Sequence, residues 1–350
     1  MSAFAEVGFV GCGSHATNNL YPMLKYSRCR LAAVCDLNEA LARRNAAVFG
    51  ASSVYADAEK MLAEQKLDGV LVVGPPEMHY QVGMKVLHRG IPLFIEKPPA
   101  PDLKKAEELV QLAGANGTFV MTGFMKRHGL TYAKIRSFVT GGQFAPAAGL
   151  FRYTHWAATN LNGMLMGMSI HPIDLAISFF GDVAEVTSCW RQEGGMGSLG
   201  LILRFTSGRF AQLVLASAVR IQERVEITGV MQGKPAVFIV DNVQHMELHT
   251  AGLGGVDLVA FKDGKWTTPE LYEIQPKFDL DDIKVWRPDY AIPNMAQNSP
   301  FLVGYAGEIR EFADAILEKR EPCPGTEDTL KAMRVIDAIL ANPNATSRLQ

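Results

Sequence analysis

A glycine-rich turn near the start of the chain constrains the fold more than any other feature. The apolar run at residues 7–10 leads into Gly11-Cys12-Gly13-Ser14-His15-Ala16, and a helix-like stretch follows over about 14–25. A short continuous apolar run is typical of a parallel strand buried on both faces. The pattern GxGxx(G/A) between such a strand and a helix predicts a turn that wraps a dinucleotide pyrophosphate at the helix N-terminus.

The small residues of this turn each have a structural role. Gly11 permits the tight turn, Gly13 lets the backbone approach the pyrophosphate, and Ala16 allows close packing of helix and strand. Ser14 and His15, in the first turn of the helix, complete the predicted cofactor contacts at this point. A purely structural glycine turn is the alternative interpretation.

Asp36 ends the second predicted strand, 23 residues after Gly13. An acid in this place accepts hydrogen bonds from the adenosine ribose and repels a 2′-phosphate, which favours NAD over NADP. Asp36 could also serve as a helix N-cap, and the two roles are compatible. Arg43 and Arg44 follow on the next predicted helix, where helical spacing places them a turn or more from the ribose.

Alternating strands and helices fill the first part of the chain. Strands are predicted at 31–35, 69–73, 92–95 and 118–121, and helices at 38–48, 77–87 and 102–114. This alternation predicts βαβ units and a doubly wound parallel sheet, and thus an α/β domain over residues 1–123.

The pattern changes after about residue 145. A hairpin is predicted at 201–215, with further strands at 223–229, 236–240 and 246–249, and one helix at 169–180 interrupts them. Residues 253–300 predict long loops with short strands, and helices return at 305–319 and 326–341. We therefore expect an α+β domain over 124–350 with a large, open, mostly antiparallel sheet, and the last helix packing back on the first domain.

Composition excludes several functions. With 34 Lys+Arg against 36 Asp+Glu, the chain has no electrostatic footprint for nucleic acid. It has no run of about 18 consecutive apolar residues, so no membrane span is predicted. Its five cysteines form no CxxC pair, and no His/Asp/Glu cluster has metal-ligand spacing, so we expect neither disulfides nor a metal. Without a basic leader the expected compartment is the cytoplasm.

Glu96-Lys97-Pro98 is the second chemical signal. It follows the strand predicted at 92–95, at the edge where doubly wound sheets bind ligands. Partial burial and a cationic neighbour would lower the pKa of Lys97 and let it shuttle a proton or polarise a carbonyl. Glu96 is expected to orient Lys97 or hold the cofactor. A lysine on a solvated strand end is the alternative.

These features together resemble the glucose–fructose oxidoreductase/inositol dehydrogenase (Gfo/Idh/MocA) family. The resemblance spans nearly the whole chain. Its motifs are the GxGxxA turn, Asp36, Pro75-Pro76-Glu77-Met78-His79, Glu96-Lys97-Pro98, Gly-Phe-Met-Lys-Arg at 123–127, His171-Pro172-Ile173-Asp174-Leu175 with Gly181, and Thr326-Glu327-Asp328. It implies a Rossmann domain, an open-faced sheet domain, NAD(P)-linked chemistry at a sugar or polyol carbon, and a homodimer or homotetramer formed through the open sheet face.

The resemblance also implies the catalytic residues. Lys97 matches the lysine that lies between the substrate hydroxyl and the nicotinamide, and His171 matches a helix histidine that acts as general acid/base. Many members carry Asp four residues before this histidine, where this chain has Gly167. Three accounts stay open: Lys97 and His171 suffice without it, another carboxylate replaces it, or standard dehydrogenase activity is lost.

Substrate contacts are expected just before the His171 helix. Tyr153 and Trp156 could stack on a sugar face, and His155 and Asn160 could bond hydroxyls. These residues could equally point elsewhere.

Three more residues complete the predicted site. Arg127 is expected to contact cofactor or substrate, with an exposed helix arginine as the alternative. Pro75 and His79 are expected to shape the nicotinamide side, with a turn-capping role as the alternative for His79.

The sequence therefore predicts an NAD-dependent oxidoreductase that transfers a hydride between nicotinamide and a secondary alcohol or ketone of a sugar, inositol or related polyol. Two alternatives stay open: an NAD-dependent, redox-neutral enzyme that cleaves glycosides, and a non-catalytic nucleotide-binding regulator. Fold alone does not separate them.

Overall fold

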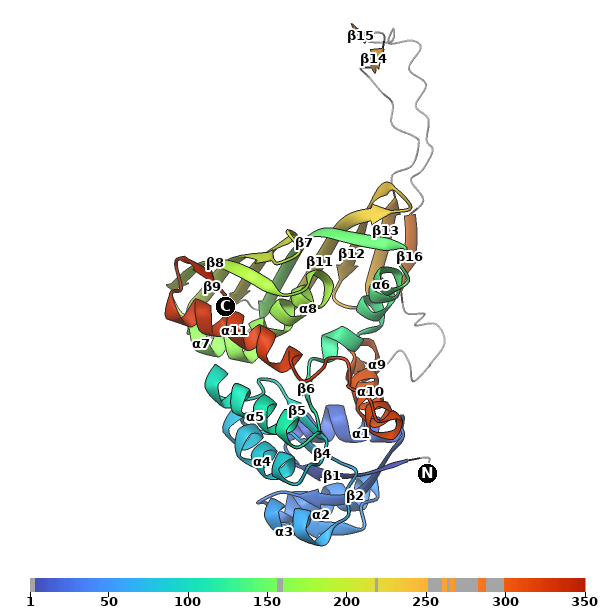
Figure 1. The fold of residues 1–350 in the computed structure, drawn as a ribbon, viewed down its shortest axis with the longest axis vertical. Coiled ribbons are helices and arrows are strands. Elements are labelled where there is room, and N and C mark those ends of the chain that lie inside the picture. Colours follow the sequence, from blue (N-terminus) through green and yellow to red (C-terminus); the bar gives the residue numbers. More distant parts are fainter. Residues whose placement is uncertain are drawn as a thin grey trace.

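A computed structural model describes residues 4–155, 160–217, 220–250, 260–262, 265–267, 283–287 and 299–349, the two short strands at 260–267 by their backbone only. Two large sheets organise these residues, one in the lower and one in the upper half of Figure 1.

The first sheet is parallel throughout and has six strands in the order β3-β2-β1-β4-β5-β6. The strands are β1 (Ala5–Val10), β2 (Cys29–Cys35), β3 (Ser53–Tyr55), β4 (Gly69–Val72), β5 (Leu93–Glu96) and β6 (Val120–Gly123). Around them lie η1 (Ala16–Leu20), α1 (Tyr21–Leu24), α2 (Glu39–Phe49), α3 (Ala58–Glu64), α4 (Pro76–His88) and α5 (Leu103–Ala115). The predicted doubly wound parallel sheet is confirmed; β3 and α3 had given no clear sequence signal.

The second sheet has nine strands in the order β16-β13-β12-β11-β7-β10-β9-β8-β17. They are β7 (Phe144–His155), β8 (Val183–Glu193), β9 (Met196–Phe205), β10 (Phe210–Ser217), β11 (Gln222–Met231), β12 (Lys234–Asp241), β13 (His245–Thr250), β16 (Ile283–Trp286) and β17 (Thr346–Arg348). Only β7 and β10 pair in parallel, so the predicted mostly antiparallel sheet is confirmed. A separate ribbon joins β14 (Ala260–Lys262) to β15 (Lys265–Thr267). The rest of the predicted loop region at 253–300 lies mostly outside the described residues.

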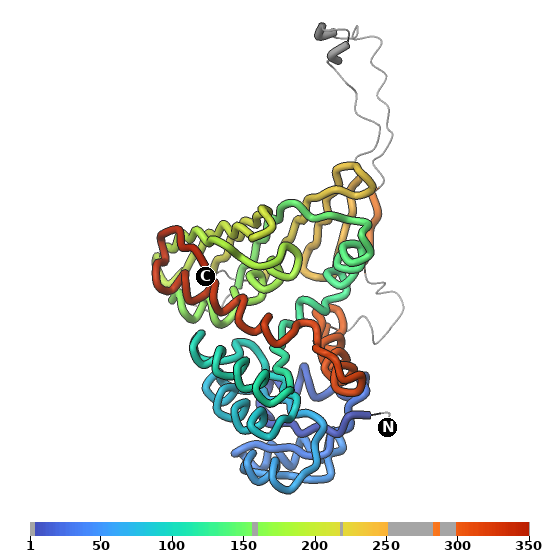
Figure 2. The backbone as a smooth tube through the Cα atoms, in the orientation of Figure 1, coloured from blue at the N-terminus to red at the C-terminus, as the bar shows by residue number. Residues whose placement is uncertain are grey.

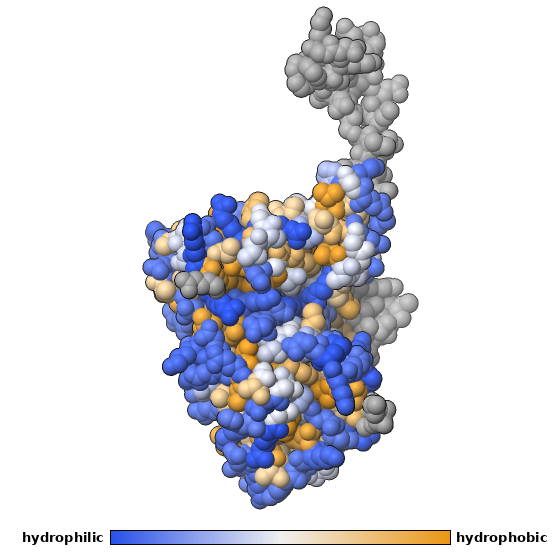
Figure 3. All heavy atoms as spheres, in the orientation of Figure 1, coloured by the Kyte–Doolittle hydropathy of each residue, from blue (hydrophilic) through white to orange (hydrophobic). Residues whose placement is uncertain are grey.

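Helices cover one face of this second sheet. They include α6 (Leu130–Thr140), which contacts β7, and α8 (Ile170–Phe180), which packs on β7 and β10. The short segment η2 (Met125–His128) precedes α6, and α7 (Leu161–Met164) and η3 (Leu165–Ser169) precede α8. Along β10, buried and more accessible residues alternate, as expected when only one face of a strand is covered. The surface visible in Figure 3 is mostly hydrophilic, with apolar side chains interspersed.

The apolar helical segment Leu161–Phe180 is long enough to cross a membrane by length and composition. Within the described ranges it is the one segment that meets this test, and 72% of its tested window is buried inside the protein. It is therefore a core helix of the second sheet's layer.

The C-terminal helices join the two sheets. Following α9 (Ser299–Leu302), α10 (Tyr305–Glu318) packs on α1, η1 and β1, and its Phe312 enters the core of the first sheet. Next, α11 (Asp328–Ala341) contacts α5 and β6 on one side and α8 and β8 on the other. Figure 2 shows this red end of the chain running from the lower half back to the upper sheet.

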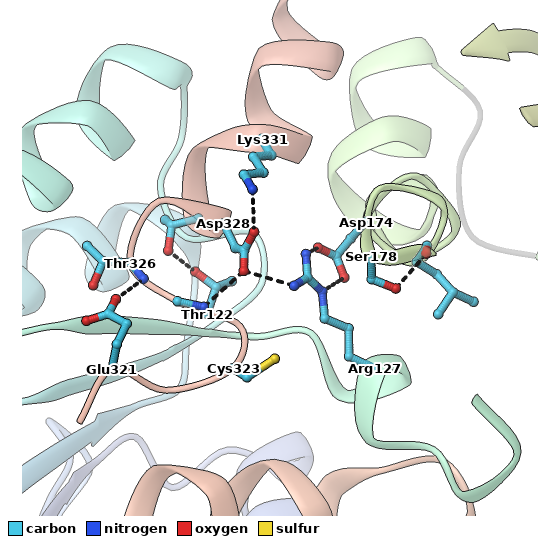
Figure 4. A network of polar contacts seen from close by, with 12 residues as sticks. Thr122, Arg127, Asp174, Ser178, Glu321, Cys323, Thr326, Asp328 and Lys331 are labelled. Atoms are coloured by element: carbon cyan, nitrogen blue, oxygen red, sulfur yellow. Dashed lines mark hydrogen bonds and ion pairs between the residues drawn. The ribbon is translucent and has the colours of Figure 1, made fainter. Parts of the chain in front are cut away.

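A buried ion-pair network fixes this junction. In η2, Arg127 Nε and Nη2 donate to Asp174 at 2.9 and 2.6 Å, and its Nη1 donates to Asp328 at 3.0 Å. Lys331 lies 3.0 Å from the same Asp328 carboxylate (Figure 4). Arg127 thus ties the segment after β6 to α8 and α11.

We expect Arg127→Met to destabilise the protein strongly, because it leaves the buried Asp174 carboxylate without its cation. Removing one partner of a buried pair costs about 3–5 kcal/mol. Urea unfolding measures the change. The control is Arg43→Met, since Arg43 and Glu39 form an exposed pair on α2 whose loss costs below about 0.5 kcal/mol. Equal losses in the two variants would contradict the role of the network.

Candidate active site

The glycine turn has the shape that a dinucleotide requires. Gly11 has φ +105°, and a Cβ there would lie 2.0 Å from the carbonyl oxygen of Val73, so only glycine fits. A Cβ on Gly13 would meet no atom within 4 Å, so the space outside the turn is open. The chain is helical from Ser14 through Leu24, and Gly13, Ser14 and His15 are exposed. Open space at a helix N-terminus suits a pyrophosphate.

Asp36 is tied to this turn. Its Oδ2 accepts from the backbone N–H of Cys12 at 2.6 Å, and its Oδ1 accepts from Asn38 N–H at 2.8 Å. Each carboxylate oxygen keeps a further lone pair for ribose hydroxyls. Arg43 is paired with Glu39, whereas Arg44 bonds to Thr17 and Asn45.

His79 joins two loops at the carboxyl edge of the sheet. Its Nε2 accepts from Gly74 N–H at 2.9 Å, which leaves Nδ1 to donate to the carbonyl of Pro98 at 2.8 Å. Burial lowers the pKa of His79 and favours this neutral form. His79 thus links the turn after β4 to the segment after β5. Pro75 is the N-cap of α4, with φ −65°.

Glu96, the last residue of β5, is buried and engaged on both oxygens. Its Oε2 accepts from the backbone N–H of Lys97 at 2.9 Å. Its Oε1 lies 3.3 Å from His15 Nε2. Glu96 therefore connects the end of β5 to the start of the helix after the glycine turn.

Lys97 reaches from the first sheet to the layer of the second. Its Nζ donates to the carbonyl oxygen of Gly167 in η3 at 2.7 Å. Burial lowers the pKa of Lys97, the Glu96 charge opposes this shift, and the Lys126 charge adds to it. The environment thus favours loss of its proton more than water does.

His171 is buried in the first turn of α8. Among the described residues its Nδ1 has no hydrogen-bond partner. Burial holds the pKa of His171 well below its usual range, and Lys97 and Lys126 add to the shift, followed by His15 and His155. A neutral imidazole with a vacant nitrogen beside an ammonium can accept a proton.

The predicted substrate residues take different positions. Tyr153 and His155 end β7 and line a cavity of about 10 Å³, room for about one water molecule. Met164, Met168, Ser169, Leu215, Ala216 and Ser217 complete its lining. Asn160 caps α7, because its side chain accepts from Gly163 N–H at 2.8 Å. Trp156 lies outside the described residues.

Arg127 requires a correction. It is neither an exposed helix residue nor a lining residue of this site, because its guanidinium is buried and bound to Asp174 and Asp328. Its neighbour Lys126, which the sequence interpretation passed over, carries the charge that acts on Lys97 and His171.

Lys126 belongs to a buried polar group. Its Nζ is ion-paired with Glu223 of β11, which also accepts from the Tyr132 hydroxyl. The ammonium lies 5.2 Å from the ring centroid of Tyr153. The sequence signal for Lys126 was its place in Gly-Phe-Met-Lys-Arg. Its role could not be assigned from the sequence, because its partner Glu223 lies 97 positions away.

Within the described ranges no group of three His, Cys, Asp or Glu side chains could hold a metal ion.

Comparisons with known proteins agree with this geometry. Residues 5–124 match a family model described as an oxidoreductase family with an NAD-binding Rossmann fold, and residues 152–346 match the C-terminal alpha/beta domain of that family. The chain is 29% identical over 197 residues to inositol 2-dehydrogenase of Arthrobacter sp., covering 54% of this chain and 57% of the relative. It is 34% identical over 112 residues to D-glucoside 3-dehydrogenase of Escherichia coli, covering 32% of each.

These alignments span about half or less of the two relatives' lengths. The fold match is wider: a dehydrogenase crystal structure from Chromobacterium violaceum superimposes with a TM-score of 0.82 at 22% identity, covering 97% of this chain and 95% of that one.

We expect two glycine variants to separate folding from cofactor binding. Gly11→Ala forces a Cβ onto a backbone carbonyl and should lower both thermal stability and NAD affinity. Gly13→Ala has room in the protein, so it should keep the melting temperature and lose NAD affinity about tenfold or more by obstructing the pyrophosphate. Calorimetry and NAD titration measure both. Unchanged NAD affinity in Gly13→Ala would contradict the placement of the pyrophosphate.

Proposed function

Because the chain belongs to the Gfo/Idh/MocA oxidoreductase family, we propose that it is an NAD-dependent oxidoreductase acting on a secondary alcohol or ketone of a sugar, inositol or related polyol. One observation carries the proposal. The half-buried Lys97 and the buried His171 come from the layers of different sheets and lie within electrostatic reach of each other at the carboxyl edge of the parallel sheet. The names of the Arthrobacter and Escherichia coli relatives support the substrate class.

The cofactor fits the glycine turn, because Gly13 leaves open space where a pyrophosphate would lie and Asp36 faces the same turn. Gly11, Gly13, Ser14, His15 and Asp36 would hold its nucleotide half. Pro75, His79, Glu96 and Lys97 would border its nicotinamide half. When bound, NAD supplies the hydride acceptor of the reaction. Asp36 favours NAD over NADP by charge.

The side chains of the protein handle the proton. Alcohol oxidation breaks a C–H and an O–H bond, and the carbon loses a hydride while the oxygen loses a proton. Lys97 Nζ would donate a hydrogen bond to the substrate oxygen, and the vacant Nδ1 of His171 would take the proton. Because burial keeps His171 neutral, the base is ready at neutral pH. We assign substrate contacts to Tyr153 and His155, because His155 lies within electrostatic reach of Lys97 and His171 and Tyr153 ends the same strand.

No observation in the described part of the chain favours redox-neutral glycoside cleavage or a purely regulatory role. We also propose that the chain divides into two domains, residues 1–123 and 124–350, although α10 of the second packs on the first sheet.

We propose the cytoplasm as the compartment, since all five cysteines are free thiols, as in a reducing environment. Cell fractionation tests this placement.

We expect Lys97→Met and His171→Asn each to lower kcat by about 10²–10⁴-fold, the range for loss of a positioned proton-transfer group. NAD affinity should change little in His171→Asn. On the acid side, wild-type activity should be lost only as pH falls through the lowered pKa of His171, well below the ordinary value of about 6.5. This acid limb should be missing in His171→Asn. The assay is NADH absorbance with an active polyol, and full turnover in either variant would contradict the mechanism.

We further propose a homodimer or homotetramer formed through the open sheet face. Leu150, Ile202, Phe210 and Val214, on β7, β9 and β10, are exposed apolar residues of neighbouring strands. Light scattering should show an oligomer that Val214→Lys dissociates. Val48→Lys, at an exposed position on α2, is the matched control and should leave the assembly intact. A monomeric wild type would contradict this part of the proposal.

A further inference from the structure

The ammonium of the half-buried Lys97 has no carboxylate partner in the described part of the chain. Among the described residues its hydrogen bond goes to the backbone carbonyl of Gly167, and none of their ion pairs includes it. A buried cation without a counter-ion pays a desolvation penalty that a paired anion would offset.

The acids nearby are already occupied. Glu96 bonds to the backbone N–H of Lys97 and contacts His15, and Glu223 bonds to Lys126 and Tyr132. A third acid, Glu308 of α10, is fully buried near Glu96. Burial and the Glu96 charge raise the pKa of Glu308 well above its usual range, which disfavours its charged form.

The groups that act on His171 are basic. After burial, the influences on it are Lys97 and Lys126, followed by His15 and His155. These four groups are the charges that act most strongly on it. The electrostatic environment at His171 therefore suits a negative charge more than a neutral group.

Open space lies at Gly167, the residue whose carbonyl accepts the hydrogen bond from Lys97. Gly167 has no side chain, and a Cβ built on it would meet no atom within 4 Å. Its carbonyl oxygen lies 2.7 Å from Lys97 Nζ. Among the described residues, the place that a side chain at Gly167 would take is therefore open, and the carbonyl of the same residue holds the ammonium.

We propose that the substrate is a polyhydroxy acid, such as an aldonic or uronic acid, whose carboxylate lies in the open space beside Gly167 and pairs with Lys97. The inference rests on the proposed function and specifies its substrate. The reaction is unchanged: the carbinol carbon gives a hydride to the oxidised cofactor, His171 takes the hydroxyl proton, and the carboxylate itself is not altered. A charge-assisted contact of this kind would select acids over neutral polyols of the same carbon skeleton.

The first experiment compares matched ligands on the full-length protein saturated with NAD. Uronic and aldonic acids are set against the aldoses and alditols of the same stereochemistry, and both NADH formation and the shift in melting temperature are measured. We expect kcat/KM at least about tenfold higher for an acid than for its neutral partner, as a close charge pair provides. Equal or better turnover of the neutral compounds would overturn the inference and leave the proposed function standing.

The second experiment uses two variants of nearly equal size. Gly167→Asp places a carboxylate where the substrate's would lie, and Gly167→Asn places a neutral amide there. We expect Gly167→Asp to lower kcat/KM for the acid about tenfold more than Gly167→Asn does, because only Asp competes for Lys97. Similar losses in the two variants would overturn the inference.

Ligand binding, measured as a shift in melting temperature, tests the inference separately from the proposed function. If no compound is oxidised although NAD binds, the proposed function fails. The inference is still decided, because acids should raise the melting temperature of the wild type more than that of Gly167→Asp. Stabilisation of the two proteins to the same extent would count against a carboxylate at this position.

Discussion

The ion pair between Arg127 and Asp174 is the interaction on which the candidate site depends. Arg127 follows β6 of the first sheet, and Asp174 lies on α8, three residues after His171. The pair therefore fixes the helix that carries His171 relative to the sheet that carries Lys97. The hydrogen bond from Lys97 to Gly167 crosses the same boundary. A shift of α8 would separate the two groups that the proposed proton transfer needs together.

Burial gives this site its chemistry. It is the largest cause of the lowered pKa of His79, Lys97 and His171, and in each case it disfavours the protonated form. The neutral form has a different role in each of the two histidines. A neutral His79 holds two loops together by accepting one hydrogen bond and donating another. A neutral His171 leaves Nδ1 without a hydrogen-bond partner among the described residues, and this is the atom to which we assign the substrate proton.

The parts of the site that follow local rules could be predicted from the sequence. The strand, turn and helix around Gly11 obey period and φ constraints confined to a few residues, and the strand before Lys97 reads as a buried apolar run. Contacts between segments far apart in the sequence could not be predicted. Lys126 pairs with a glutamate 97 positions away, and Arg127 was predicted as a ligand contact because its partners lie 47 and 201 positions away. Asn160 could have been assigned as a cap, since it directly precedes a helix.

The state of His171 is the central claim of this account, and its titration tests that claim most directly. Imidazole nitrogen chemical shifts, followed by NMR against pH and assigned by comparison with His171→Asn, report its protonation in the folded protein. The account predicts that the His171 signals stay those of a neutral ring from about pH 7.5 down to about pH 5.5, where an ordinary histidine with a pKa near 6.5 is mostly protonated. A titration of His171 at the ordinary value would contradict it.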